Sequence, residues 1–172
     1  PGDQILFKRG QIFNYIQNVA PGHGRAKYGY LFGAYGTGVK PIIQPANGFG
    51  GNMISLTGNG AAWIVFKDLN FIGTGTDGVT AGEILFTTQE ASQFLFYNVD
   101  FKDVSRAITL SNRPGDLPTS DANYNVVSGV FLVDSTISNS SKGTSIYAIA
   151  HRLALVNTLM NYSDNHQTYF EA

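Results

Sequence analysis

The clearest pattern in the chain is an eight-residue segment with apolar and polar residues at fixed positions that occurs four times without gaps. The four copies are residues 64–71, 94–101, 130–137 and 153–160. In each copy the first, third and eighth positions are apolar, and the fifth is an aspartate or asparagine. The fifth positions are Asp68, Asn98, Asp134 and Asn157. Apolar alternation predicts a strand with one buried face, and the polar fifth position predicts a bend into a second strand.

A second apolar patch follows each copy and predicts a third strand. These patches are residues 84–86, 107–110, 145–148 and 169–170, and residues 30–38, 40–43 and 53–56 predict an earlier unit of the same kind. The fifth positions are 30, 36 and 23 residues apart, so the connecting turns differ in length. Three short strands without an intervening helix bury their apolar faces only by stacking on neighbouring units. The pattern therefore predicts an all-β, right-handed parallel β-helix, with the Asp and Asn side chains stacked in a hydrogen-bonded ladder.

The composition of the chain limits the number of domains and the kinds of partner that we expect. The 172 residues, 43% of them hydrophobic, suit one domain over residues 1–172. A net charge of -1 and the lack of a basic run beside aromatics exclude nucleic acid as a partner. No apolar run approaches the roughly 20 residues of a membrane span, so we expect no membrane insertion. Because an open β-helix exposes its core at both ends, we expect a segment of a larger protein, capped by further chain segments or partner subunits.

Three stretches resemble known proteins. Residues 1–10 and 32–43 are similar to the opening of secreted bacterial pectate-lyase-like β-helix proteins, and residues 61–69 are similar to the coil that follows in them. Those families include polysaccharide lyases, glycoside hydrolases, uronan epimerases and surface proteins without known chemistry. The resemblance implies an extracellular or cell-surface protein that acts on or binds a polysaccharide. It also implies a substrate groove along one sheet, which directs attention to the third strand of each coil.

Cationic side chains flank that third strand on both sides. Arg106, Lys142 and His166 precede it in three successive coils, and Arg113, His151 and Arg152 follow it. This arrangement suits an anionic polysaccharide such as a uronan, with Lys142, His151 and Arg113 as substrate-binding residues. The alternative is that they are ordinary solvent-exposed turn residues, partly neutralised by nearby aspartates.

A uronan lyase needs a base that removes the proton beside the uronate carboxylate, and a cation that stabilises the resulting charge. His166 is the candidate base, with Asp164 beside it, and Arg106 and Arg152 are the candidate cations. The stretch 164–170 resembles an Asn-His-x-x-Tyr run of β-helix coils. Tyr147 and Tyr169 are candidates for stacking on sugar rings.

A glycoside hydrolase would instead need two carboxylates about 5 to 9.5 Å apart in one cleft. The pairs on offer are Asp100 with Asp103 and Asp116 with Asp121. No Asp-rich calcium loop and no cysteine occurs, so we expect neither a metal nor a cofactor. Two classes of function stay open: a carbohydrate-active β-helix, and a non-catalytic adhesin or filament module that uses the coil as a rigid scaffold.

Overall fold

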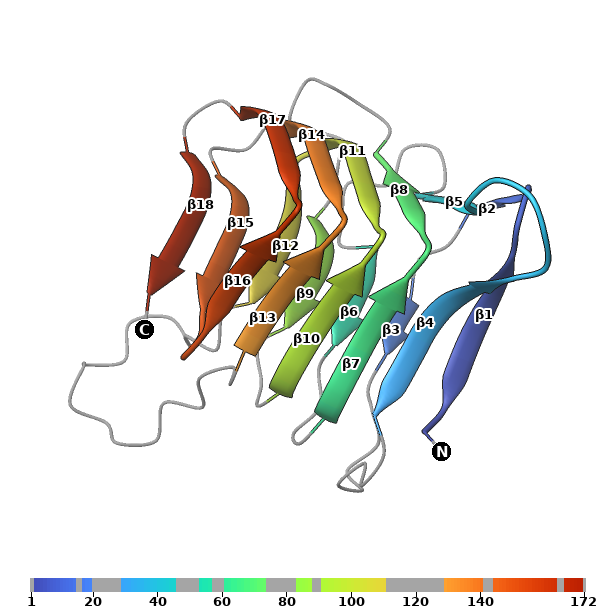
Figure 1. Ribbon diagram of the computed structural model, residues 1–172, viewed down its shortest axis with the longest axis horizontal. Coiled ribbons are helices and arrows are strands. Elements are labelled where there is room, and N and C mark those ends of the chain that lie inside the picture. Colours follow the sequence, from blue (N-terminus) through green and yellow to red (C-terminus); the bar gives the residue numbers. More distant parts are fainter. Residues whose placement is uncertain are drawn as a thin grey trace.

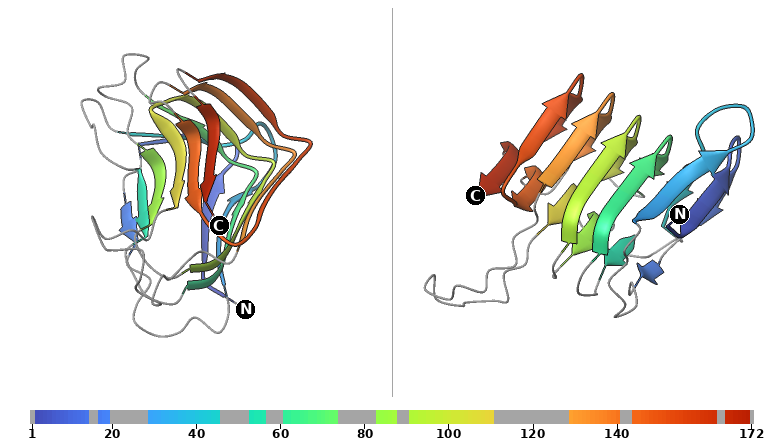
Figure 2. Two further views of the ribbon diagram at one scale, coloured as in Figure 1. Left: turned by 90° about the vertical axis from the view of Figure 1, so that its left-hand side faces the viewer. Right: turned by 60° about the horizontal axis from the view of Figure 1, so that its bottom comes forward.

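The computed structural model describes residues 2–14, 17–19, 29–45, 53–56, 61–73, 83–87, 91–110, 129–140, 144–163 and 166–171. These residues form strands β1 to β18 and, within the described ranges, no helix. The strands wind into six stacked coils of three strands each (Figures 1 and 2). Every pairing between coils is parallel, so the predicted parallel β-helix is confirmed.

The coils build three parallel sheets of six strands each. Sheet A consists of β1 (Gln4–Lys8), β4 (Tyr30–Tyr35), β7 (Ala61–Lys67), β10 (Ala91–Tyr97), β13 (Gly129–Val133) and β16 (Leu153–Val156). Sheet B consists of β2 (Ile12–Asn14), β5 (Ile42–Gln44), β8 (Asn70–Ile72), β11 (Asp100–Val104), β14 (Thr136–Ser140) and β17 (Leu159–Ser163). Sheet C consists of β3 (Gln17–Val19), β6 (Ile54–Leu56), β9 (Glu83–Thr87), β12 (Arg106–Leu110), β15 (Thr144–Ile149) and β18 (His166–Glu171).

The register of sheets A and B reproduces the sequence repeat. The first repeat positions pair as neighbours in sheet A, in the order Ile64, Phe94, Val130 and Leu153. The eighth positions pair in the same way in sheet B. The earlier unit predicted over residues 30–56 is coil 2, which consists of β4, β5 and β6. One more coil, consisting of β1, β2 and β3, precedes it, and the repeat did not predict this coil.

Stacked phenylalanines fill the interior. Phe32, Phe66 and Phe96 form one column in sheet A, with ring centroids 4.8 and 5.0 Å apart. Phe71 and Phe101 form a second column in sheet B, with centroids 5.5 Å apart. All five side chains are buried, and the columns meet edge to face. Rings at equivalent positions stack because parallel strands in register place identical side chains about 4.8 Å apart.

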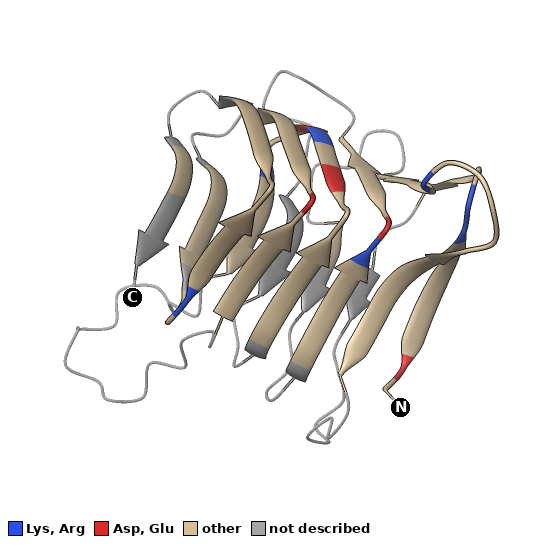
Figure 3. Ribbon diagram, in the orientation of Figure 1, with Lys and Arg blue, Asp and Glu red and all other residues tan. Residues whose placement is uncertain are grey.

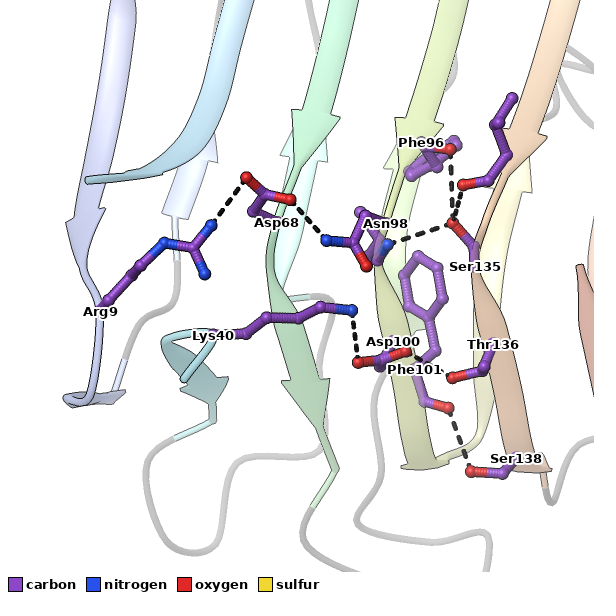
Figure 4. A network of polar contacts seen from close by, with 12 residues as sticks. Arg9, Lys40, Asp68, Phe96, Asn98, Asp100, Phe101, Ser135, Thr136 and Ser138 are labelled. Carbon is purple, nitrogen blue, oxygen red and sulfur yellow. Dashed lines mark hydrogen bonds and ion pairs between the residues drawn. The ribbon is translucent and has the colours of Figure 1, made fainter. Parts of the chain in front are cut away.

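The predicted ladder lies at the bend between sheets A and B. Asp68, Asn98, Asp134 and Asn157 all adopt the left-handed conformation, with φ between 46° and 59°. The Asn98 amide donates to Asp68 Oδ1 at 2.6 Å, and the Asn157 amide donates to Asp134 Oδ1 at 2.7 Å. Arg9 of coil 1 extends the row by an ion pair with Asp68 at 2.8 Å (Figure 4). Asp and Asn suit these positions because they tolerate the left-handed region better than other residues with side chains.

At the bend, the backbone N–H groups also change their hydrogen-bonding partner from one neighbouring coil to the other. The Asn98 N–H donates to Val133 O in coil 5 at 2.9 Å, whereas the Asp100 N–H donates to Leu69 O in coil 3 at 3.0 Å. A second ladder, which the sequence analysis did not predict, lies near the bend between sheets B and C. It too is built from Asp and Asn residues in the left-handed conformation. Asp103 and Asn139 have φ of 52° and 54°, and the Asn139 amide donates to Asp103 Oδ1 at 2.8 Å.

The ladder leads to a stability prediction. Asn98→Gly removes the side-chain bond to Asp68 and keeps the left-handed backbone relaxed, so we expect a loss of about 1–2 kcal/mol. Asn98→Ala removes the same bond and adds left-handed strain, so it should cost about 1 kcal/mol more. Urea unfolding of both variants measures the difference. Equal midpoints for the two variants would show that the bend stores no backbone strain.

The phenylalanine column gives a second prediction. Phe66→Ala removes a ring that contacts Phe32, Phe71 and Phe96. We expect a loss of about 3–5 kcal/mol in the free energy of unfolding. Phe66→Leu, which keeps most of the apolar volume, should cost clearly less. Thermal unfolding followed by circular dichroism compares the two, and an equal loss would contradict the importance of the filled volume.

Candidate functional site

Sheet C carries the residues that the sequence analysis placed at a polysaccharide groove. Ile108 and Ile146 are buried neighbours on its inner side. The next position along the strand gives a row of neighbours across coils 4, 5 and 6, in the order Thr109, Tyr147 and Tyr169. Tyr147 is half-buried, whereas Thr109 is 4% exposed although it lies on the outer side.

Arg106 explains why Thr109 is covered. Arg106 is the first residue of β12, and its Nη1 donates to Thr109 Oγ1 at 3.3 Å. Its guanidinium carbon lies 5.5 Å from the centroid of the Tyr147 ring on the neighbouring coil. The structure therefore brings together two of the predicted site residues, Arg106 and Tyr147, as a cation–π pair over the outer side of sheet C.

His166 and Tyr169 belong to the same sheet in coil 6. The backbone of His166 begins β18 and is paired with Thr144, and Tyr169 is paired with Tyr147. Arg106 and His166 thus begin strands two coils apart at one end of sheet C. With a coil spacing of about 4.8 Å, their backbones are separated by roughly 10 Å.

His151 and Arg152 lie at the opposite end of sheet C. Both are exposed and follow β15, in the bend that leads into sheet A. The length of the strand separates their backbones from the Arg106 end by roughly 20 Å. The described candidates therefore form two groups, with Arg106, Tyr147, Tyr169 and His166 in sheet C, and His151 and Arg152 beyond its far end. Asp164, Lys142 and Arg113 lie outside the described residues.

The carboxylates considered for hydrolysis have structural partners. Asp100 accepts from Thr136 Oγ1 at 2.7 Å and forms an ion pair with Lys40 at 2.8 Å. Asp103 belongs to the second ladder. Asp116 and Asp121 lie outside the described residues. Within the described ranges, no group of three His, Cys, Asp or Glu residues is arranged to hold a metal ion.

Sequence reasoning missed one extended surface. The second position of each repeat is apolar as well, with Val65, Leu95, Phe131 and Ala154, although it points to the outer side of sheet A. Figure 3 shows this sheet almost free of charged residues. A polar residue is the usual choice at such a position, so the unbroken apolar run was the signal that could have revealed it.

Comparisons of the chain with protein-family models, with curated proteins and with solved structures find no match. In the part of the chain that the structure describes, no helix is long and apolar enough to span a membrane.

The cation–π pair can be tested on its own. Arg106→Met and Tyr147→Leu in a double-mutant cycle should give a coupling of about 0.5–1 kcal/mol in the free energy of unfolding. The matched control combines Arg106→Met with Tyr97→Leu, a tyrosine of sheet A, and should give a coupling near zero. Equal coupling in both cycles would contradict a specific contact between the guanidinium and Tyr147.

Proposed function

We propose that the protein is an extracellular, carbohydrate-active β-helix that binds an anionic polysaccharide of the uronan type along sheet C. One observation carries the proposal: Arg106 lies over Tyr147 on the outer side of neighbouring coils. A guanidinium can bind a carboxylate through two parallel hydrogen bonds, and aromatic rings stack on the apolar faces of sugars. The pair thus combines the two groups that recognition of a uronate residue requires.

The geometry of the coil supports a linear polymer as the ligand. Residues of sheet C recur in register from coil to coil, with Phe86, Thr109, Tyr147 and Tyr169 as successive neighbours. A surface that repeats along one axis can contact several units of a chain that runs along it. The extracellular location is part of the proposal and is inferred from the resemblance of residues 1–10, 32–43 and 61–69 to secreted pectate-lyase-like proteins.

If the proposed protein is a uronan lyase, it needs a residue that acts as the base and a cation that neutralises the substrate carboxylate. His166 would take the proton beside the uronate carboxylate while Arg106 neutralises that carboxylate. The electron pair of the broken C–H bond forms a carbon–carbon double bond, and the bond to the glycosidic oxygen breaks. The leaving oxygen then takes up a proton. Both residues begin strands at the same end of sheet C, which supports this pairing.

A non-catalytic adhesin or filament module is the second candidate. The separation of His151 and Arg152 from the Arg106 end favours it, because those cations do not converge with the others on one point. The phenylalanine columns and the two ladders also suit a rigid spacer.

Binding tests the proposal most directly. We expect the protein to bind polygalacturonate or alginate, and Arg106→Gln to weaken that binding at least tenfold, measured by calorimetry at low salt. The matched control is Lys102→Gln, which removes an exposed cation from sheet B and should change affinity less than twofold. Equal effects of the two substitutions, or no binding of any uronan, would contradict the proposal.

Activity separates the two candidates. Incubation with the bound uronan should increase the ultraviolet absorbance of unsaturated chain ends together with the number of reducing ends. His166→Ala should abolish both increases and leave affinity largely unchanged. Binding without either increase would favour the non-catalytic module.

A further inference from the structure

The outer side of sheet A carries an apolar column that crosses all six coils. Its members are neighbours in register, and all but the first are apolar: Gln4, Leu31, Val65, Leu95, Phe131 and Ala154. The five apolar residues are half-buried, because neighbouring side chains shield them only in part. We call this column and the outward residues on its two sides the sheet A outer face.

Most of the described residues beside the column are apolar or aromatic, although Gln93 and Lys67 flank it as well. Leu6, Trp63, Tyr97 and Val156 are 43%, 55%, 39% and 53% exposed. The six strands of sheet A contain two charged residues, Lys8 and Lys67, each at the last position of its strand. The Lys67 ammonium lies over the Tyr97 ring at 5.6 Å. The centre of the face therefore offers apolar surface without charge.

Neighbouring side chains of the face cover two of its glycines, Gly33 and Gly129. A Cβ at Gly129 would lie 2.7 Å from the Phe131 ring, so that ring covers the glycine. A Cβ at Gly33 would lie 3.4 Å from Leu6 and 3.5 Å from Leu31, so these two leucines close over the glycine. Large side chains thus lie over positions without side chains.

The face is about as large as the largest apolar patches that monomers expose. Six strands about 4.8 Å apart, each about five residues long at about 3.3 Å per residue, cover roughly 30 by 17 Å, or about 500 Å². Monomers rarely expose contiguous apolar patches larger than a few hundred Å², and the largest patches are often functional. Burying two such faces removes at most about 1,000 Å², which lies at the threshold for a biological interface and below the roughly 1,200 Å² of stable ones, so the expected dimer is weak.

We propose that the sheet A outer face binds the same face of a second copy of this chain. Two sheets pack face to face about 10 Å apart through apolar side chains. A two-fold axis in the interface, parallel either to the strands or to the coil axis, lays the central column of one copy along that of the other. In the first case Val65 faces Leu95, and Leu31 faces Phe131. A net charge of -1 opposes this pairing only weakly.

The chemistry of the face favours protein over sugar as its partner. A polysaccharide requires hydrogen-bonding groups that fix its hydroxyls. The polar groups of the sheet A outer face lie at Gln4 and beside the column, at Gln93, Lys67, Trp63 and Tyr97, and the middle of the column has none. Sheet C instead brings Arg106, Thr109 and Tyr147 together. The two faces thus have different roles, and self-association through sheet A leaves sheet C accessible.

The first test uses one charge on each of two sheets. Leu95→Glu places a carboxylate at the centre of the sheet A outer face, and Ile72→Glu places one on the outer side of sheet B beside Lys102. By sedimentation velocity over a range of concentrations, the unaltered protein and Ile72→Glu should dimerise alike. Leu95→Glu should weaken the dimer at least tenfold. Circular dichroism checks that both variants are folded.

A second test does not depend on a destabilising charge. The chain has no cysteine, so Leu95→Cys introduces a single reactive thiol. A short bis-maleimide should convert Leu95→Cys into a covalent dimer and leave Ile72→Cys without a covalent cross-link between copies. A monomeric protein at all concentrations would overturn the proposal. So would equal cross-linking of the two variants, or association that Leu95→Glu leaves intact, as docking through the coil end that exposes Leu155 and Leu159 would give.

Discussion

Hydrogen bonding between stacked coils is the constraint on which the rest of the structure depends. A single coil has three short strands that cannot pair with one another, so its backbone groups and its apolar side chains are satisfied only by the coils on either side. The left-handed bend allows one coil to form hydrogen bonds with the coils on both sides. At Asn98 the backbone changes from the following coil to the preceding one, and its side chain joins the ladder with Asp68.

The same register determines what each face of the coil can do. Because equivalent residues recur about every 4.8 Å, any residue type that repeats becomes a continuous row. Inside, this produces the phenylalanine columns. Outside, it produces an apolar row on sheet A and a row with polar and aromatic side chains on sheet C. Each proposed function depends on such a row. The row on sheet C is proposed to bind a glycan, and the row on sheet A is proposed to bind a second copy of the chain.

The proposed glycan site and the proposed dimer are physically compatible. Sheets A and C form different sides of the coil, and the contacts that cover Thr109 do not involve Leu95 or Phe131. A dimer formed through sheet A would present two sheet C surfaces, so that one polysaccharide chain or two neighbouring chains could be held at two points. Such bivalent binding raises the effective affinity without any new contact.

The sequence by itself determined the fold class, because the repeat records the register directly. Ile64, Phe94, Val130 and Leu153 align in the sequence and pair in sheet A, and the aspartates and asparagines predicted at the first bend are the residues found there. The repeat does not extend to the first coil, whose bend uses Gly10 instead of Asp or Asn, and the sequence indicated that coil only through the resemblance of residues 1–10 to the opening of known β-helix proteins.

Only the tertiary structure decided which distant residues meet. Arg106 and Tyr147 are far apart in the chain, and turns of unequal length hide the register that places one over the other. The same stacking assigned Asp100 to Lys40 and Thr136, and it separated His151 and Arg152 from the Arg106 end of sheet C. Strand alternation is local and can be read from the sequence, whereas contacts between coils depend on how the intervening turns close.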